Sequence, residues 1–402
     1  MVDASANPEY QFLLPEELIA QQPAPRRGDS RMLLVTPGVG VVGERPFRAI
    51  EEILRPGDLL VLNQSEVLPA RLATWRPETG GAVEILLIRP EGPSSWTAMA
   101  RPARRLKPGV VLAVQGADPA QEGELLTVER KNEDGTVVVN AAIDPGELAR
   151  KYGTMPLPPY IKHHPEREAE GEREALARHR YQTVYCRPDP RGAASVAAPT
   201  AGLHFSRDTL AQLEARGVKL AYLTLHVGPG TFQPPDRDQI AARRLHSEFF
   251  HLPLAVSRAL AETRASGGRV IAVGTTSLRV LETVARLGLE MVEAPAGDPV
   301  DFGPTAQDPS PVFTGQARRE GGHWEVSGQT RLFISPPDRV QAADGLVTNF
   351  HLPGSSLLML VASLMGSDIW RGVYAHAVQE RMRFYSYGDC MLILPPPGEN
   401  DE

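Results

Sequence analysis

The chain has little cysteine and no long hydrophobic run. Only two of its 402 residues are cysteines, Cys186 and Cys390, which excludes a disulfide framework and any multi-cysteine zinc or iron–sulfur site. The most apolar segment, residues 357–365, is about half as long as the roughly 20 residues that a membrane span needs. The polar start of the chain lacks the apolar core of a signal peptide. We therefore expect a cytoplasmic protein that does not associate with membranes.

Positive charge is also scarce. The chain has 42 Lys and Arg against 49 Asp and Glu, a net charge of −7. This balance excludes a strongly basic nucleic-acid coat protein, but it leaves room for a local basic patch. Hydrophobic residues make up 42% and charged residues 23%, as in a globular protein. At roughly 100–200 residues per domain, the length predicts two or three domains.

The first part of the chain predicts a strand followed by a small β-rich domain. Residues 59–63 (LLVLN) have the pattern of a buried strand. After residue 66, short β-rich runs are separated by Gly, Pro and Asp at close spacing, which is typical of an antiparallel barrel or sandwich. These runs are residues 82–88, 96–100, 110–114, 124–130 and 136–143.

From residue 199 onward, helical and strand patterns alternate, which predicts a parallel or mixed sheet. The predicted helices are 206–217, 253–268, 275–288, 355–365 and 368–384, and the predicted strands are 218–227, 269–274, 345–350 and 390–395. Residues 289–330 are predicted to be rich in loops. The expected fold class is α/β: a mixed-sheet α/β domain of residues 1–65 and 153–402, with a small antiparallel β-barrel domain inserted at 66–152.

A charged segment follows the predicted barrel. Residues 163–180 have almost no apolar stripe, so they are predicted to form a solvated surface helix or a mobile insertion. The pair His163-His164 has no third ligand at metal spacing, and no metal site is predicted.

Four histidines lie in turns rich in Gly, Pro and Thr: His204, His226, His246 and His351. His226 and His351 follow predicted strands and precede glycine turns, where open α/β sheets build ligand sites. Each one could also be an ordinary hydrogen-bonded turn residue. Four histidines in the same kind of sequence favour a functional site over four separate structural roles. Glu248, close to His246 in the sequence, could act with it as an acid–base group.

Two further segments could bind anions. Val273-Gly274-Thr275-Thr276-Ser277-Leu278-Arg279 is a strand–turn–helix junction whose amides and hydroxyls could hold a carboxylate or phosphate, or simply cap the helix. It is not a GxGxxG fingerprint, so a dinucleotide-binding fold is not indicated. Arg101, Arg104, Arg105 and Lys107 form a basic cluster that could pair with phosphates or be a solvated face.

Long, irregular motifs follow one another in order from about residue 11 to residue 394. They are PGDLLVLN (56–63), LPARL (68–72), ARPARRLKPG (100–109), MPLPPYI (155–161), YQTVY (181–185), SVAAPTAGLHF (195–205), TLHVGPGTFQP (224–234), LHSEFF (245–250), RVIAVGTTSLRVLET (269–283), LVTNFHLPGSSLLMLV (346–361) and RFYSYGDCMLI (383–393). Through these motifs the chain resembles the S-adenosylmethionine:tRNA ribosyltransferase-isomerase family of queuosine biosynthesis. It departs from the family pattern at Glu66, where the family has a basic residue, and in the extra residues 187–191.

The resemblance implies a fold and a reaction. The fold would be an α/β domain with an inserted barrel. The reaction would transfer and isomerise the ribosyl moiety of S-adenosylmethionine onto 7-aminomethyl-7-deazaguanine at the tRNA wobble position, giving epoxyqueuosine-tRNA, adenine and methionine. S-adenosylmethionine would be a substrate, and no prosthetic group is implied. Two alternatives stay open: an S-adenosylmethionine-dependent RNA methyltransferase and a non-catalytic tRNA-binding module. We expect a monomer.

The motifs also suggest roles for individual residues. As a hypothesis, the acid–base groups are His204, His226, His246, Glu248 and His351, with Glu248 binding the aminomethyl cation or acting as a base. Contacts to S-adenosylmethionine are predicted for Thr200, Gly228, Gly230, Thr231, Gly274, Thr275, Thr276, Ser277, Arg279 and Asn349, with residues 274–277 and Arg279 holding the methionine carboxylate. Contacts to tRNA phosphates are predicted for Arg71, Arg101, Arg104, Arg105 and Lys107.

Overall fold

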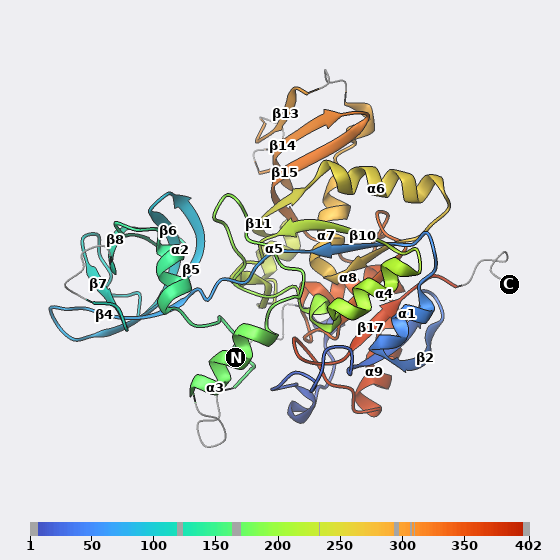
Figure 1. The fold of residues 1–402 in the computed structure, drawn as a ribbon, viewed down its shortest axis with the longest axis horizontal. Helices are drawn as coiled ribbons and strands as arrows, with labels where there is room; N and C mark the ends of the chain where they lie inside the picture. Colours follow the sequence, from blue (N-terminus) through green and yellow to red (C-terminus); the bar gives the residue numbers. More distant parts are fainter. Residues whose placement is uncertain are drawn as a thin grey trace.

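A computed structural model of the chain describes residues 7–118, 124–162, 170–232, 234–292, 297–305, 308 and 310–396. In these residues the chain forms an 11-stranded mixed sheet and a separate closed barrel of six strands. Figure 1 shows the barrel on the left of a larger α/β body, with helix α3 below the connection between the two. The predicted fold class, a mixed α/β sheet with a small antiparallel barrel, is confirmed.

The large sheet has the order β13-β14-β15-β11-β10-β3-β12-β16-β17-β1-β2. Its strands are β1 (Arg31–Thr36), β2 (Gly40–Pro46), β3 (Leu59–Asn63), β10 (Lys219–Leu225), β11 (Arg244–Leu252), β12 (Val270–Val273), β13 (Pro299–Phe302), β14 (Phe313–Glu320), β15 (His323–Leu332), β16 (Gly345–Asn349) and β17 (Cys390–Ile393). The central strands β10, β3, β12 and β16 are parallel neighbours. Their carboxyl ends therefore meet at one edge of the sheet, where ligand sites form in open α/β folds.

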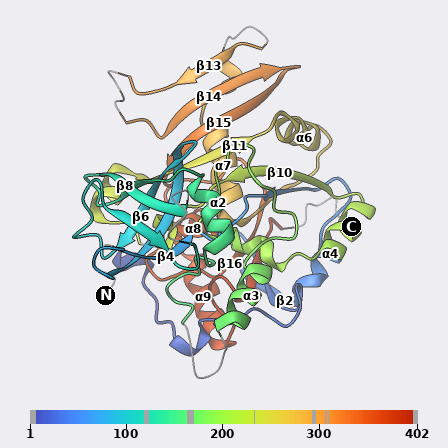
Figure 2. The ribbon, with the colours of Figure 1, turned by 60° about the vertical axis from the view of Figure 1, so that its left-hand side comes forward.

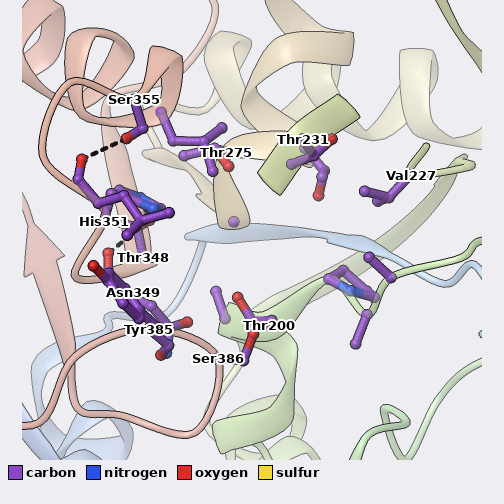
Figure 3. A pocket seen from close by; sticks show the side chains of 18 of the residues that line it. Thr200, Val227, Thr231, Thr275, Thr348, Asn349, His351, Ser355, Tyr385 and Ser386 are labelled. Carbon is purple, nitrogen blue, oxygen red and sulfur yellow. Dashed lines mark hydrogen bonds between the residues drawn. The ribbon is translucent and has the colours of Figure 1, made fainter. Parts of the chain in front are cut away.

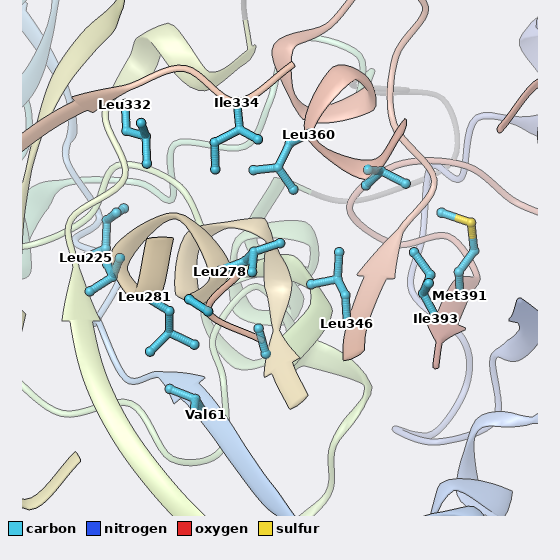
Figure 4. Packing of buried hydrophobic residues seen from close by; sticks show 14 of the residues in the cluster. Val61, Leu225, Leu278, Leu281, Leu332, Ile334, Leu346, Leu360, Met391 and Ile393 are labelled. Atoms are coloured by element: carbon cyan, nitrogen blue, oxygen red, sulfur yellow. The ribbon is translucent and has the colours of Figure 1, made fainter. Parts of the chain in front are cut away.

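The central strands are buried on both faces. Along β3, Leu59 and Val61 join one apolar cluster, and Leu60 and Leu62 join another on the opposite face, as the two-residue period of a strand requires. Figure 4 shows part of the first cluster, where Leu278 and Leu360 meet the sheet. Two-sided burial explains why these strands have continuous apolar sequences.

Helices cover the two faces of the sheet. They are α1 (Ile50–Ile53), α4 (Arg207–Ala215), α5 (Arg237–Ala242), α6 (Leu254–Ala265), α7 (Gly274–Ala285), α8 (Ser356–Met365) and α9 (Ile369–Gln379). Ser206 caps α4 by accepting a hydrogen bond from the Thr209 amide, and Ser355 caps α8 in the same way. No single helix in the described ranges is long and apolar enough to cross a membrane; α8 and α9 meet the criterion only together, across a bend of 113°.

The barrel has the strand order β4-β5-β6-β9-β8-β7 and closes through β4 and β7. Its strands are β4 (Arg71–Trp75), β5 (Ala82–Gly92), β6 (Ser95–Arg101), β7 (Val111–Val114), β8 (Leu125–Lys131) and β9 (Val137–Asn140), and helix α2 (Pro145–Tyr152) follows them. The indole of Trp96 is buried against α2 and donates to Asp144 Oδ1 at 2.6 Å. The barrel strands lie within the range 66–152 that the sequence assigns to the insertion.

The prediction of a loop-rich segment at 289–330 was wrong. Strands β13, β14 and β15 extend the large sheet there, and β14 pairs with β15 from Phe313–Thr330 to Glu320–His323. Every second residue of β15 is buried, but the buried positions include Gly328 and Thr330 as well as Trp324 and Val326. Because small and polar residues interrupt the apolar alternation, the sequence pattern is weak.

The predicted charged helix at 163–180 forms only in part. Helix α3 spans Glu170–Arg180, and residues 163–169, including His163 and His164, lie outside the described residues. Ala177 is buried against the rest of the molecule, so this helix is not wholly solvated.

Candidate active site

A pocket opens where three of the parallel strands, β10, β12 and β16, end (Figure 3). Val227 follows β10, Gly274 follows β12, and Asn349 ends β16. The remaining wall residues are Tyr160, Ala197, Ala198, Pro199, Thr200, Ala201, Thr231, Thr275, Thr276, Thr348, Phe350, His351, Leu352, Ser355, Leu357, Tyr385 and Ser386. The cavity among them has a volume of about 70 Å³ and opens to solvent at its mouth.

The start of α7 forms one wall of this pocket. Gly274 has φ +88°, a left-handed conformation that glycine adopts without strain. The residue before the helix is Val273, and no side chain caps the first turn. Thr276 Oγ1 is buried and has no hydrogen-bond partner among the described residues. The Thr276 hydroxyl therefore does not serve as a helix cap, and it is available to a ligand.

Asn349 forms another wall, and His204 fixes its orientation from behind. Asn349 Nδ2 donates to His204 Nε2 at 3.2 Å and to the Tyr385 carbonyl at 3.0 Å. His204 lies at the end of η5 (Thr200–His204), and its Nδ1 is 2.6 Å from Ser30 Oγ. Because His204 Nε2 accepts, its Nδ1 carries the proton and donates to Ser30. The amide oxygen of Asn349 is buried without a partner among the described residues.

His351 and His204 are both neutral at pH 7. Burial lowers the pKa of His351 to about 3. Burial also lowers the pKa of His204 to about 3, with help from the positive charge of Arg383. His351 Nε2 is 2.8 Å from Thr348 Oγ1, which orients the ring in the pocket wall (Figure 3). An imidazole with so low a pKa is a weak base at pH 7.

Glu248 holds the loop after β10 from outside the pocket. Its Oε1 accepts from the Gly228 amide and from Thr231 Oγ1, both at 2.8 Å, and its other oxygen pairs with Arg279. Arg279 is on α7 and is 7% exposed, and burial lowers its pKa to about 10, so it remains a cation at pH 7. This buried pair connects α7 to the 3₁₀ turn η6 (Pro229–Phe232). Arg279, predicted to hold a methionine carboxylate, is thus paired with a protein carboxylate.

His226 and His246 do not line the pocket. His226 Nε2 is 2.8 Å from Asp189 Oδ2, and its ring stacks on Phe249. Burial would raise the pKa of Asp189, but hydrogen bonds from His226 and Arg191 outweigh it and hold this pKa well below its usual range. His246 is exposed on β11 and packs against the α-carbon of Gly230.

The predicted site residues therefore separate into two groups. Those in the pocket wall are Thr200, Thr231, Gly274, Thr275, Thr276, Asn349 and His351, and those outside the wall are His204, His226, Gly228, Gly230, His246, Glu248, Ser277 and Arg279. The sequence analysis missed Tyr160 and Tyr385 as wall residues. Tyr160 Oη is 2.6 Å from Ser386 Oγ, and Tyr385 has φ +72°, which is unusual for a non-glycine residue. The sequence indicated Tyr160 and Tyr385 only through the two motifs that contain them, MPLPPYI and RFYSYGDCMLI.

The basic cluster lies at the end of β6 and in the turn after it. Arg101, Arg104, Arg105 and Lys107 are exposed and form no ion pair with the described part of the chain. Arg71 differs, because its guanidinium is 3.0 Å from Glu84. Arg71 and Arg101 line a second cavity, of about 230 Å³, between the barrel and residues 156–159.

Glu66 pairs with Arg150 at 2.8 Å, so this neighbouring arginine compensates its negative charge. Trp96 is 1% exposed inside the barrel, so it offers no surface for a stacked base. The described residues contain no group of three or more His, Cys, Asp or Glu that could hold a metal ion.

The family model and the relatives found by sequence agree with one another. A family model described as "Queuosine biosynthesis protein" matches residues 7–393. A relative from Pelobacter propionicus, named S-adenosylmethionine:tRNA ribosyltransferase-isomerase, is 41% identical over 96% of this chain and 98% of its own length. A relative from Thermotoga maritima with the same name is 40% identical over 96% of this chain and 99% of its own length. A crystal structure titled S-adenosylmethionine tRNA ribosyltransferase, also from Thermotoga maritima, is 33% identical with a TM-score of 0.49, and the match covers 96% of this chain and 100% of that one.

Proposed function

The chain belongs to the queuosine biosynthesis protein family, and we propose that the pocket at its strand ends binds S-adenosylmethionine as a ribosyl donor. The enzyme transfers and isomerises the ribosyl group onto the aminomethyl group of 7-aminomethyl-7-deazaguanine at the wobble position of tRNA. The products are epoxyqueuosine-tRNA, adenine and methionine. We propose that the enzyme acts as a monomer in the cytoplasm.

The observation that carries this proposal is a pair of buried polar atoms without partners. Asn349 Oδ1 and Thr276 Oγ1 belong to two different walls of the pocket, and neither has a hydrogen-bond partner among the described residues. Leaving such groups unpaired costs about 1–3 kcal/mol each. S-adenosylmethionine can pair both, because its ammonium, ribose hydroxyls and adenine amine donate and its carboxylate accepts.

The reaction needs a group that moves protons. It begins when a base removes a proton from the carbon beside the sulfonium, where the positive sulfur makes the carbon acidic. His351 lies in the wall, and we assign this proton to it, although its pKa of about 3 makes it a weak base. Once protonated it is a strong acid, so it can return the proton to the departing adenine. The amine of the tRNA base adds to the sugar, and an alkoxide then closes the epoxide and expels methionine.

We assign supporting roles to the predicted residues outside the wall. His204 holds the Asn349 amide so that its oxygen remains available to the substrate. Glu248 and Arg279 hold the 228–231 loop, which places Thr231 in the wall. Glu248 lies outside the pocket wall and pairs with Arg279, so we assign it to positioning rather than to direct contact with the aminomethyl group.

The barrel supplies the proposed contact with tRNA. Arg101, Arg104, Arg105 and Lys107 carry unpaired positive charge on an acidic protein, and such side chains pair with phosphates. The cavity at Arg71 and Arg101 also includes Val196 and Pro229, which are sequence neighbours of the pocket residues Ala197 and Val227. When the wobble base enters the pocket, the sugar–phosphate backbone of the tRNA beside it would therefore lie near the barrel.

Product analysis tests this function. The protein is incubated with S-adenosylmethionine and tRNA bearing the aminomethyl base, and the small products are separated. We expect equal amounts of adenine and methionine, with both absent when the tRNA is omitted. Release of S-adenosylhomocysteine would instead identify an RNA methyltransferase, and tight tRNA binding without any product would identify a binding module.

A further inference from the structure

Helix α3 has no part in the reaction described above, yet the molecule holds it firmly. Ala177 and the following Tyr181 are buried, and Glu174 accepts a hydrogen bond from the Met155 amide at 3.1 Å. Arg178 pairs with Glu174 at 2.8 Å, and Arg180 donates to the carbonyl of Ala24 at 2.8 Å. A polar helix that is held at so many points presents its charged side chains in fixed positions.

A groove runs along this helix from the barrel. The cavity at the barrel shares Arg71 and residues 157–159 with a second cavity beside α3. That second cavity shares Ile161, Lys162 and Arg173 with a third, which reaches the N-terminal residues 17–23. Figure 2 shows the barrel and α3 on the same side of the α/β body. The segment 156–161 forms a wall of this groove, and its Tyr160 lies in the wall of the active-site pocket, so the groove passes beside that pocket.

In the part of the chain that the structure describes, the groove carries two cations without a carboxylate partner, on a protein of net charge −7. Its lining contains the cations Arg71, Arg101, Lys162, Arg173 and Arg383 and the carboxylates Glu17, Glu84 and Glu174. Arg71, Lys162 and Arg383 pair with Glu84, Glu16 and Asp389, so Arg101 and Arg173 are the cations left without a carboxylate partner among the described residues. Arg173 has no carboxylate partner within the described residues and contacts only the Ile161 carbonyl, at 3.4 Å. Leu157, Pro158 and Ile161 give the groove an apolar surface between these charges.

We propose that α3 and this groove bind the sugar–phosphate backbone of the substrate tRNA, with Arg173 pairing to a phosphate. This proposal rests on the function proposed above. Phosphate contacts position a nucleic acid without reading its sequence, which suits a groove that carries spaced cations and apolar surface for ribose. The helix would thus extend the barrel's basic patch into a track that passes the pocket mouth.

Charge substitutions at Arg173 test the proposal. The variants are Arg173→Gln and Arg173→Glu, and the control is Arg318→Glu, an exposed arginine on β14 at the far end of the large sheet (Figure 1). Binding of tRNA bearing the aminomethyl base is measured by fluorescence anisotropy over a series of salt concentrations. We expect Arg173→Gln to reduce the slope of log affinity against log salt by about one, and Arg173→Glu to weaken binding about tenfold or more. The KM for tRNA should rise in Arg173→Glu and stay at the wild-type value in Arg318→Glu.

Two results would overturn the proposal in distinguishable ways. If the wild type releases adenine but Arg173→Glu and Arg318→Glu bind tRNA equally well, α3 does not contact the tRNA and the proposed function stands. If the wild type binds this tRNA but releases no adenine, the proposed function fails and this proposal fails with it. Arg173→Gln keeps a helix-forming side chain of similar length, so one variant reports on charge with little effect on folding.

Discussion

Asn349 donates through Nδ2 to His204 Nε2, and this hydrogen bond leaves the amide oxygen unpaired at the pocket wall. The imidazole lies outside the wall, so it acts on the substrate through the amide. Ser30 on the far side of the imidazole fixes the tautomer that can accept the hydrogen bond. Through these contacts the buried His204 acts as a positioning residue. Its substitution should therefore affect the reaction through Asn349.

Replacing His204 with alanine should lower activity through Asn349. The loss of its acceptor leaves the buried Nδ2 group less well paired, a cost of about 1–3 kcal/mol, and we expect kcat/KM for adenine release to fall about 10- to 100-fold. Ser30→Ala should give a smaller decrease in the same direction, because it removes only the partner of Nδ1. Steady-state kinetics with tRNA at saturation check both values. Equal, wild-type kinetics in the two variants would show that the tautomer does not matter.

Glu248→Gln should destabilise the protein strongly, because it leaves the buried Arg279 cation without its partner. Breaking a buried pair by removing one side costs roughly 3–5 kcal/mol. The double variant Glu248→Gln with Arg279→Met removes the stranded charge, so it should regain most of this loss. Urea unfolding of the wild type, the two single variants and the double variant completes the cycle. Additive effects of the two substitutions would mean that the pair does not couple.

The double variant should remain a poor enzyme even if its stability returns. Thr231 belongs to the pocket wall, and its hydroxyl is held by Glu248. Without the ion pair, the 228–231 loop loses its connection to α7, and the Kd for S-adenosylmethionine should rise about tenfold or more. Isothermal titration with S-adenosylmethionine measures this effect separately from catalysis.

Acid should destabilise the fold through His204 and His351. Each has a pKa of about 3 in the folded state, against 6.5 for an unperturbed histidine. Between these values the unfolded chain binds more protons than the folded one, so stability is fully present above about pH 6.5 and is lost as pH falls toward 3. Each histidine adds at most about 1.4 kcal/mol per pH unit. Unfolding free energies across this range should show a shallower slope in His351→Gln, and an unchanged slope would contradict the assignment.

The barrel patch should control tRNA affinity and leave S-adenosylmethionine binding unaffected. In Arg104→Ala with Arg105→Ala, the slope of log affinity for tRNA against log salt should decrease by about two, one for each lost phosphate contact. Arg318→Ala, at the other end of the molecule, serves as the matched control. A salt slope that is the same in both proteins would remove the patch from the tRNA-binding surface.

Much of the fold was predictable because the central strands have strong, continuous apolar sequences. LLVLN at 59–63 and RVIAVG at 269–274 correspond closely to β3 and β12. The strands β13 to β15 were missed because Gly, Thr and Arg interrupt their apolar alternation. Strand β11 contains LHSEFF, which attracted attention as a possible site instead of a strand.

The pocket at the strand ends was predictable in its location but not in the direction of the side chains around it. Three of the four histidine motifs and the GTTS turn contribute residues to this pocket, as the position of strand ends in α/β sheets suggests, whereas His246 lies on strand β11. However, His204 and His226 point to Ser30 and Asp189, which are far away in the sequence. Arg279 pairs with Glu248 because the packing of α7 places them together. The spacing of residues along the sequence does not predict such a contact. Tyr160 reaches the pocket from the connection after the barrel, which local patterns do not reveal.

The most direct test of the account follows ribose-labelled S-adenosylmethionine in single turnover, with the wild type, Asn349→Ala and Gln115→Ala. Gln115 carries an exposed amide on the barrel and serves as the control. The account predicts that the wild type and Gln115→Ala place the label in the wobble nucleoside and release adenine, and that Asn349→Ala does so at least about 100-fold more slowly. Transfer by Asn349→Ala at the wild-type rate would show that the pocket at the strand ends is not where S-adenosylmethionine reacts.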